Sequence, residues 1–227
     1  MKEETPIDVV EYYNAPGRAE RYLKNSFGDD GCPPADIICR TFLEKFSEDM
    51  RPKDGLIVDL GCGPGTSLFY IFKALKFKEV VAIDGSERMI SILNQTFNSD
   101  TIKLRTQISD LRNGNIDVVS DSADLVISCF MMSYLENLEK LFSEVGRILK
   151  SGCFFAFNII VHKENCTDTV KLLGESPKIM QYFHNQSKIL SLAKLNGLNN
   201  VHVLDCGYKK LKNAPDLYIN LCFLRKR

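Results

Sequence analysis

The fold of this 227-residue chain is decided by the stretch VDLGCGPGT, residues 58–66. The stretch continues an apolar run that starts at Leu56, and such a run is typical of a buried strand in a parallel sheet. The glycines after it allow a ligand to approach the backbone where a side chain would collide with it. From Thr66 onward, apolar residues recur at helical spacing. We therefore predict a strand, a glycine turn and a helix, the arrangement that binds ligands in open α/β sheets.

An acidic residue follows this turn at the spacing expected for a ribose contact. Asp84 ends a second apolar run at residues 80–83, and Ser86 is placed to cap the next helix. An acid about twenty residues beyond such a turn can accept hydrogen bonds from a ribose, so the ligand is expected to carry one. Nicotinamide dinucleotides are disfavoured, because Thr66 stands where their fingerprint has its third glycine.

Strand-like and helix-like segments alternate from about residue 56 onward, which indicates a doubly wound α/β fold with helices on both faces of the sheet. Two strand-like segments joined by a short connection close the chain. Strands are expected at residues 56–60, 80–83, 102–107, 125–127, 153–161, 201–206 and 217–224. Helices are expected at residues 66–76, after Ser86, at 135–149 with a stop at Ser151-Gly152, and at 188–195.

Two segments lie outside the alternation, and we interpret them as a lid on a single domain. Residues 1–50 carry helical patterns of their own, for example over residues 37–46. Residues 163–186 are polar with scattered aromatic side chains. The domain is thus divided into an N-terminal helical cap at 1–50, a core at 51–162, a substrate-cap insertion at 163–186, and a C-terminal helix with strands at 187–227.

Composition excludes several classes of protein. Lys plus Arg equals Asp plus Glu, so the chain lacks the basic excess expected of a protein that holds long nucleic acid. Its eight cysteines occur without a Cys-x-x-Cys pair, which indicates buried thiols in a reducing cytoplasm. The polar N-terminus does not resemble a signal peptide, and no apolar run reaches the ~20 residues that span a bilayer. A cytoplasmic protein, monomeric or homodimeric, is expected.

Four motifs together resemble the class I methyltransferases that use S-adenosylmethionine (SAM). They are DLGCGPG at 59–65, IDGSERM at 83–89, SADLVIS at 122–128 and RILKSG at 147–152. The resemblance covers residues 55–227 and is strongest in the first hundred of these. It is greatest to the subgroup that acts on small molecules. It implies SAM as cofactor, S-adenosylhomocysteine (SAH) as product, and a seven-stranded sheet whose last strand is antiparallel.

The resemblance also implies roles for individual residues in cofactor binding. Asp59 would orient the methionine amino group, and Asp84 would bind the ribose hydroxyls. Met89 would pack on adenine, although a helix-core role fits it equally well. Gln107 aligns with the acid that accepts from the adenine amino group in the family, and Asp110 is the alternative acceptor. The full set of expected cofactor contacts is Asp59, Gly61, Gly63, Gly65, Asp84, Gly85, Met89, Gln107, Ile108 and Ser128.

Few residues are candidates for contact with the methyl acceptor. His162 and Tyr13 are the candidate catalytic residues, and ordinary packing remains open for both. Tyr12, Phe130, Tyr134 and His184 are candidate substrate contacts. No metal-ligand spacing is present, so no metal is expected. The expected acceptor is a small molecule, with nucleic acid and membrane not expected as partners. A peptide or protein methyltransferase and a non-catalytic SAM-binding relative remain the alternatives.

Overall fold

The computed structural model describes residues 6–26, 44, 55–74, 77–97, 102–162, 169–173, 178–208 and 217–227. The expected helical pattern at residues 37–46 lies outside this described part, apart from Glu44. The strands are β1 (Leu56–Leu60), β2 (Glu79–Asp84), β3 (Lys103–Ile108), β4 (Ala123–Ser128), β5 (Leu149–His162), β6 (Thr169–Leu173), β7 (Ile179–Phe183), β8 (Leu198–Tyr208) and β9 (Leu217–Lys226). The helices are α1 (Val9–Asn14), α2 (Arg18–Ser26), α4 (Thr66–Ala74), α5 (Glu87–Thr96), α6 (Glu139–Ile148) and α7 (Gln186–Leu195), with the short 3-10 helices η2 (Leu111–Asn113) and η3 (Met132–Tyr134).

Seven strands form one twisted sheet in the order β3-β2-β1-β4-β5-β9-β8. Strands β1 to β5 pair in parallel, whereas β9 lies antiparallel between β5 and β8. The predicted doubly wound sheet with an antiparallel last strand is thereby confirmed. The chain leaves β1 toward β2 on one side and returns to β4 on the other. In open α/β sheets, ligands bind at the carboxyl ends of strands at such a reversal point.

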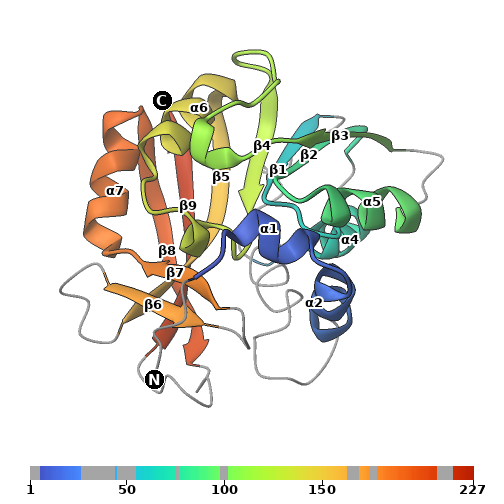
Figure 1. Cartoon of the computed structure of the whole chain (residues 1–227). Coiled ribbons are helices and arrows are strands. Elements are labelled where there is room, and N and C mark those ends of the chain that lie inside the picture. The colour runs from blue at the N-terminus through green and yellow to red at the C-terminus, as the bar shows by residue number, and fades with distance from the viewer. Residues whose placement is uncertain are drawn as a thin grey trace.

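Helices cover both faces of the sheet and produce two separate hydrophobic layers (Figure 1). Helices α6 and α7 pack on one face, where Phe142 contacts Phe155 and Phe157 at ring distances of 5.8 Å. Helices α4 and α5 pack on the other face through residues such as Leu68 and Leu93. The apolar β-strand runs are therefore buried on both sides, as a parallel sheet requires.

Three local features differ from the expectations. Strand β5 begins at Leu149, four residues earlier than predicted, because the register with β4 shifts there and Gly152 takes a left-handed φ of +79°. The preceding helix is also shorter than predicted, since it spans Glu139–Ile148 and begins four residues later than expected. The segment at 163–186 contains a two-stranded antiparallel sheet, β6–β7, that alternation of the main sheet did not predict.

The N-terminal helices lie across the carboxyl ends of the parallel strands, with the β6–β7 hairpin beside α1 (Figure 1). A parallel bridge joins Ile7 to Ile179 of β7, and the Ile7 N–H donates to the carbonyl of Lys178 at 3.0 Å. Helix α2 contacts α5, where Ala19 is fully buried against Met89. Segments that are distant in sequence thus meet over the end of the sheet at which a ligand is expected.

Candidate ligand pocket at the carboxyl ends of the strands

The glycine turn after β1 is held in a conformation that only glycine adopts without strain. Gly61, Gly63 and Gly65 have φ values of +71°, +53° and +88°. A Cβ on Gly61 would lie 2.3 Å from Cγ of Met131, and one on Gly65 would lie 2.4 Å from Cδ1 of Leu93. At Gly63, by contrast, the nearest atom would be Cε1 of Tyr22 at 3.8 Å. Gly63 therefore borders open space.

Asp84 is fixed at the end of β2 by the backbone of the same turn. Its Oδ2 accepts from the Gly63 N–H at 2.9 Å, and its Oδ1 accepts from the Ser86 N–H at 2.8 Å. Burial raises the pKa of Asp84, and the backbone hydrogen bonds oppose that rise. Each carboxylate oxygen can accept a further hydrogen bond. The geometry therefore fits an acid that receives the two hydroxyls of a ribose.

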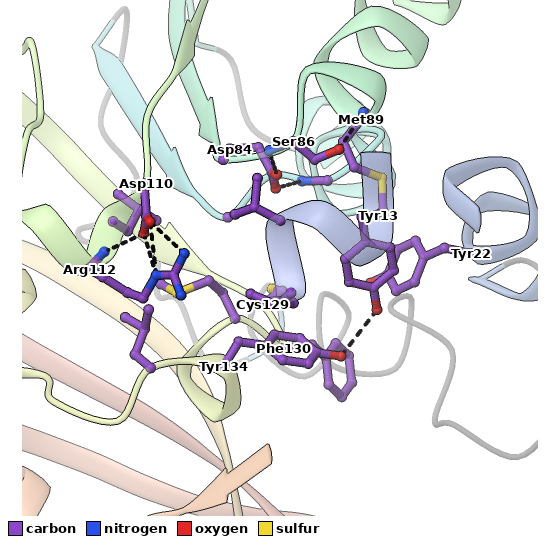
Figure 2. A pocket seen from close by; sticks show the side chains of 18 residues that line it. Tyr13, Tyr22, Asp84, Ser86, Met89, Asp110, Arg112, Cys129, Phe130 and Tyr134 are labelled. Carbon is purple, nitrogen blue, oxygen red and sulfur yellow. Dashed lines mark hydrogen bonds and ion pairs between the residues drawn. The ribbon is translucent and has the colours of Figure 1, made fainter. Parts of the chain in front are cut away.

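A single pocket brings these groups together with residues from α1, α2, η2 and η3. Figure 2 shows Asp110 and Arg112 on one side of it and Tyr13 and Tyr22 on the other. The lining comprises Val9, Val10, Tyr13, Tyr22, Gly61, Gly63, Asp84, Gly85, Ser86, Met89, Asp110, Leu111, Arg112, Cys129, Phe130, Met131, Tyr134 and Leu135. Five of the ten expected cofactor contacts belong to it, namely Gly61, Gly63, Asp84, Gly85 and Met89.

The other expected cofactor contacts do not line the pocket. Gly65 packs on α5, and the fully buried Ser128 donates its hydroxyl to the carbonyl of Leu60 at 2.9 Å. Asp59 is 1% exposed, and neither carboxyl oxygen has a hydrogen-bond partner in the described part of the chain. Burial, then the neighbouring Cys129 and Asp84, raise the pKa of Asp59 well above its usual range. A carboxyl this isolated is better accommodated in its neutral form.

Asp110, not Gln107, occupies the pocket beside β3. The Gln107 side chain holds a loop instead, since its Nε2 donates to the Asn115 carbonyl and its Oε1 accepts from the Asp117 N–H, both at 3.0 Å. Ile108 is 53% exposed and is not part of the pocket lining. Of the two alternatives for an adenine contact, Asp110 is therefore the one that the geometry favours.

Arg112 links Asp110 to the beginning of α1. Its Nε lies 2.9 Å from both oxygens of Asp110, and its Nη1 lies 2.5 Å from Oδ2 of Asp8. The hydrogen bond from Arg112 lowers the pKa of Asp110. Burial alone would raise the pKa of Asp8, but hydrogen bonds from Arg112 and the Val10 N–H lower it. The ion pairs hold the N-terminal helix against one side of the pocket.

Tyrosines from three segments meet on the opposite side. The hydroxyls of Tyr13 and Tyr134 are 3.2 Å apart, and Gln181 Nε2 of β7 donates to the Tyr134 hydroxyl at 3.2 Å. Burial, followed by the neighbouring Tyr134, raises the pKa of Tyr13 well above its usual value. Tyr12 lies outside the lining and accepts from Arg18 Nη1 at 2.8 Å. Tyr13 therefore remains a protonated hydroxyl and is poorly suited to act as a base.

Of the two histidine candidates, His184 is not part of the pocket lining. His184 places its Nε2 2.8 Å from the carbonyl of Leu135 and 3.3 Å from that of Met132, so its ring holds η3 in place. His162 is the last residue of β5, where its backbone pairs with Leu217, and its side chain lies outside what the structure describes. Phe130 and Tyr134, the other candidate substrate contacts, both line the pocket.

Several lining residues were missed in the sequence. Ser86 lies in the motif at 83–89, where its N-cap position was the available signal, whereas Arg112 lies outside the segments singled out. Tyr22 is not among the missed residues, because it belongs to the N-terminal segment whose aromatic side chains were expected to form a pocket wall. Cys129 and Met131 directly follow β4, so their place at the carboxyl end of a central strand could have identified them. The sequence pointed to α1 through Tyr12 and Tyr13, but it did not single out Val9 and Val10, which also line the pocket.

Within the described residues, no group of three or more His, Cys, Asp or Glu side chains could hold a metal ion. No described helix is long and apolar enough to cross a membrane. Among the described residues, Cys62, Cys129, Cys153 and Cys222 form no disulfide bond.

The part of the chain that contains the glycine turn matches a known protein family. Residues 57–152 match the model of a methyltransferase domain family. The chain is 33% identical over 123 residues to a yeast protein, "Probable S-adenosylmethionine-dependent methyltransferase CRG1" of Saccharomyces cerevisiae. That match covers 54% of this chain and 40% of the yeast protein. The chain thus spans about two fifths of that relative's length.

Solved structures share the fold over nearly the whole chain. Magnesium protoporphyrin IX methyltransferase from Synechocystis with bound SAH superposes with a TM-score of 0.72 at 16% identity, covering 96% of this chain and 98% of that one. A SAM-dependent methyltransferase from Clostridium acetobutylicum gives a TM-score of 0.67 at 20% identity, covering 92% and 97%.

Proposed function

Since residues 57–152 of this chain form a class I SAM-dependent methyltransferase domain, we propose that it transfers a methyl group from SAM to an oxygen, nitrogen or sulfur atom of a small molecule. SAM is the cofactor of such a domain. The observation that carries the choice of acceptor is the cover over the pocket. Val10 of α1 lies close to Gly85, which follows β2 at the pocket: a Cβ added to Gly85 would be 2.7 Å from Cγ2 of Val10.

Five residues of the pocket lining would hold SAM, and four of them would hold its adenosine part. Asp84 would accept from the ribose hydroxyls, with Gly63 leaving room for the ligand beside it. Met89 would contact adenine, because it lines the pocket as well as packing on α2. Asp110 would accept from the adenine amino group, while Gly61 would face the methionine part. The turn and Asp84 are fixed before any ligand arrives, so little conformational freedom is lost there on binding.

When bound, SAM supplies a methyl group on a positively charged sulfur, which a nucleophile displaces in line. The residues of this chain then have to position the acceptor and exclude water. Tyr13, Tyr22, Phe130 and Tyr134 supply aromatic walls for that purpose. Because the pKa of Tyr13 is raised, its hydroxyl can orient an acceptor but does not readily remove a proton at neutral pH. The scheme suits acceptors that attack without a strong enzymatic base, such as neutral amines, thiolates or carboxylates.

The cover on the pocket favours a small acceptor over a polypeptide. Three independent contacts hold α1 and α2 over the site. Asn14 Oδ1 accepts from the Ser86 hydroxyl at 2.8 Å, Glu20 pairs with Arg88, and Asp8 pairs with Arg112. A polypeptide acceptor would need an open groove where these helices lie.

The test has two stages. Calorimetry should detect binding of SAM and SAH, with no binding of NAD, and both ligands should raise the melting temperature. A panel of small amines, acids, thiols and phenols is then incubated with SAM and read by product mass. A methylated small molecule supports the proposal. Methylation confined to folded proteins or peptides would replace it with a protein methyltransferase, and SAM binding without any product would indicate a non-catalytic relative.

We also propose a cytoplasmic location, supported by the free thiols of Cys62, Cys129, Cys153 and Cys222. Fractionation of cells that express a tagged chain tests it, since recovery in a membrane or secreted fraction would contradict it.

A further inference from the structure

The turn after β4 contains a residue in a conformation that L side chains rarely adopt. Phe130 has a φ of +60°, and Asp121 is the only other described non-glycine residue with a positive φ. For a bulky side chain this left-handed conformation is strained, so surrounding contacts must impose it. Phe130 also lines the pocket (Figure 2). Strain of this kind concentrates at ligand sites.

One buried side chain provides the contact. The Phe130 N–H donates to Oδ1 of Asn158 in β5 at 2.7 Å. Asn158 is 1% exposed and stands in the otherwise apolar run from Phe154 to Val161. An asparagine in this place is not explained by packing, because leucine of similar size would fill the same space without a polar group.

The amide nitrogen of Asn158 also indicates that packing does not explain this residue. Its Nδ2 is buried without a hydrogen-bond partner among the described residues. A buried donor without a partner lowers stability. The amide is therefore retained at a cost to the fold, and such exceptions call for a functional explanation.

The turn is confined from the opposite side by the glycine turn. Met131 follows Phe130, and its Cγ lies 2.3 Å from the position of a Cβ on Gly61. The segment from Cys129 to Met131 thus lies between Asn158 on β5 and Gly61 after β1. Any relaxation of Phe130 would move the pocket wall formed by Cys129 and Met131.

We propose that Asn158 is a positioning residue for the cofactor pocket: it holds Phe130 in the left-handed conformation and thereby sets the wall that faces the ligand. The inference rests on the proposed function, because it assumes that SAM and SAH occupy this pocket. Asn158 acts through Phe130 and is not assigned a contact with either ligand.

The test compares three variants. Asn158→Leu removes the acceptor for the Phe130 N–H and keeps the volume, and Asn158→Ala removes it without added bulk. Asn158→Asp keeps an acceptor oxygen in the same place and is the matched control. Each variant is measured for melting temperature, SAH affinity by calorimetry, and the rate at which maleimide labels the Cys129 peptide, with the buried Cys62 peptide as internal reference.

We expect Asn158→Leu to melt at or above the wild-type temperature, to bind SAH about ten-fold more weakly, which is ~1.4 kcal/mol, and to label Cys129 faster. Asn158→Ala should show the same binding and labelling changes. Asn158→Asp should keep SAH affinity and Cys129 labelling close to wild type, although its melting temperature should fall because it buries a carboxyl group. Wild-type SAH affinity and labelling in both acceptor-free variants would overturn the proposal. So would losses that merely follow a lowered melting temperature, because a purely structural role predicts that pattern.

The outcome is distinguishable from a failure of the proposed function. None of these measurements requires turnover, so absence of any methylated product leaves the positioning role testable by SAH affinity. If the wild-type chain did not bind SAH, the proposed function would fail, whereas unchanged Cys129 labelling in Asn158→Leu would separately refute the role of Asn158.

Discussion

Gly63→Ala separates the cost of a left-handed backbone from the cost of a filled pocket. Gly63 has a φ of +53°, and its added Cβ would meet nothing closer than Cε1 of Tyr22 at 3.8 Å, an ordinary contact distance. The free energy of unfolding should therefore fall only by the cost of a left-handed backbone at an alanine, roughly 1–2 kcal/mol. For a chain of this size that corresponds to a fall in melting temperature of about 2–8 °C.

Gly63→Ala should weaken the binding of SAH in addition to lowering the stability of the fold. Because Gly63 lines the pocket, its new methyl group would occupy space meant for the ligand. Inserting a methyl into a filled site typically costs roughly 1–3 kcal/mol, which is about five- to more than a hundred-fold in the dissociation constant of SAH. Calorimetry at a temperature well below the melting temperature, where the variant is fully folded, measures the dissociation constant of SAH directly.

Gly197→Ala is the matched control. Gly197 has a φ of +76°, no atom lies within 4 Å of its added Cβ, and it ends α7 away from the pocket. It should show the same loss of stability with wild-type affinity for SAH. If Gly63→Ala bound SAH as tightly as Gly197→Ala does, the ligand would not lie against the glycine turn and the assignment of the pocket would be wrong.

Four further tests address the same pocket. Asp84→Ala should leave the chain folded and weaken SAM by about ten- to a hundred-fold, since hydrogen bonds to a charged acceptor contribute roughly 1.5–3 kcal/mol each; wild-type affinity would remove Asp84 from the site. Because the pKa of Asp84 is raised, the affinity for SAM should fall as the pH is lowered and the carboxylate becomes protonated. The fall should begin at a higher pH than the pKa of an ordinary aspartate would give. Asp84→Asn is the control, and its affinity should not change with pH in this range. Tyr13→Phe should leave the pH profile of methyl transfer between pH 7 and 10 unchanged, because the phenol stays protonated; loss of an ionisation in the variant would make Tyr13 a base. Arg112→Gln should speed proteolysis within residues 6–26, and SAH should slow it; cleavage indifferent to both would contradict the docking of α1.

The sheet could be predicted from the sequence because its signals are local. Apolar runs of strand length, the glycine turn and the Ser86 cap each fix a short segment, and alternation of strands with helices leaves few topologies. The SAM cofactor followed from the motif at 59–65 read together with Asp84, and both the fold and the cofactor are confirmed.

The pocket wall was less accessible to sequence reasoning because it depends on contacts between distant segments. Gln107 was preferred over Asp110 by alignment alone, yet the turn at 109–110 brings Asp110 into the pocket and leaves Gln107 bonded to Asn115. The β6–β7 hairpin lacks the strong alternation that marks a core strand. Asn158 gave no signal at all, since its role depends on the conformation of Phe130, a residue of another strand's turn.

The docking of α1 bears on the pace of the catalytic cycle. Val10 lies close to Gly85, and Asp8 and Asn14 are bonded to Arg112 and Ser86, so the helix lies over the pocket on the route by which we expect a nucleoside to enter and leave. Each turnover has to replace spent SAH with fresh SAM through that same route. We therefore expect cofactor exchange to be no faster than the undocking of the helix. Residence time of the product, measured by stopped-flow displacement, is then a property of three surface contacts and not of the chemistry at the methyl group.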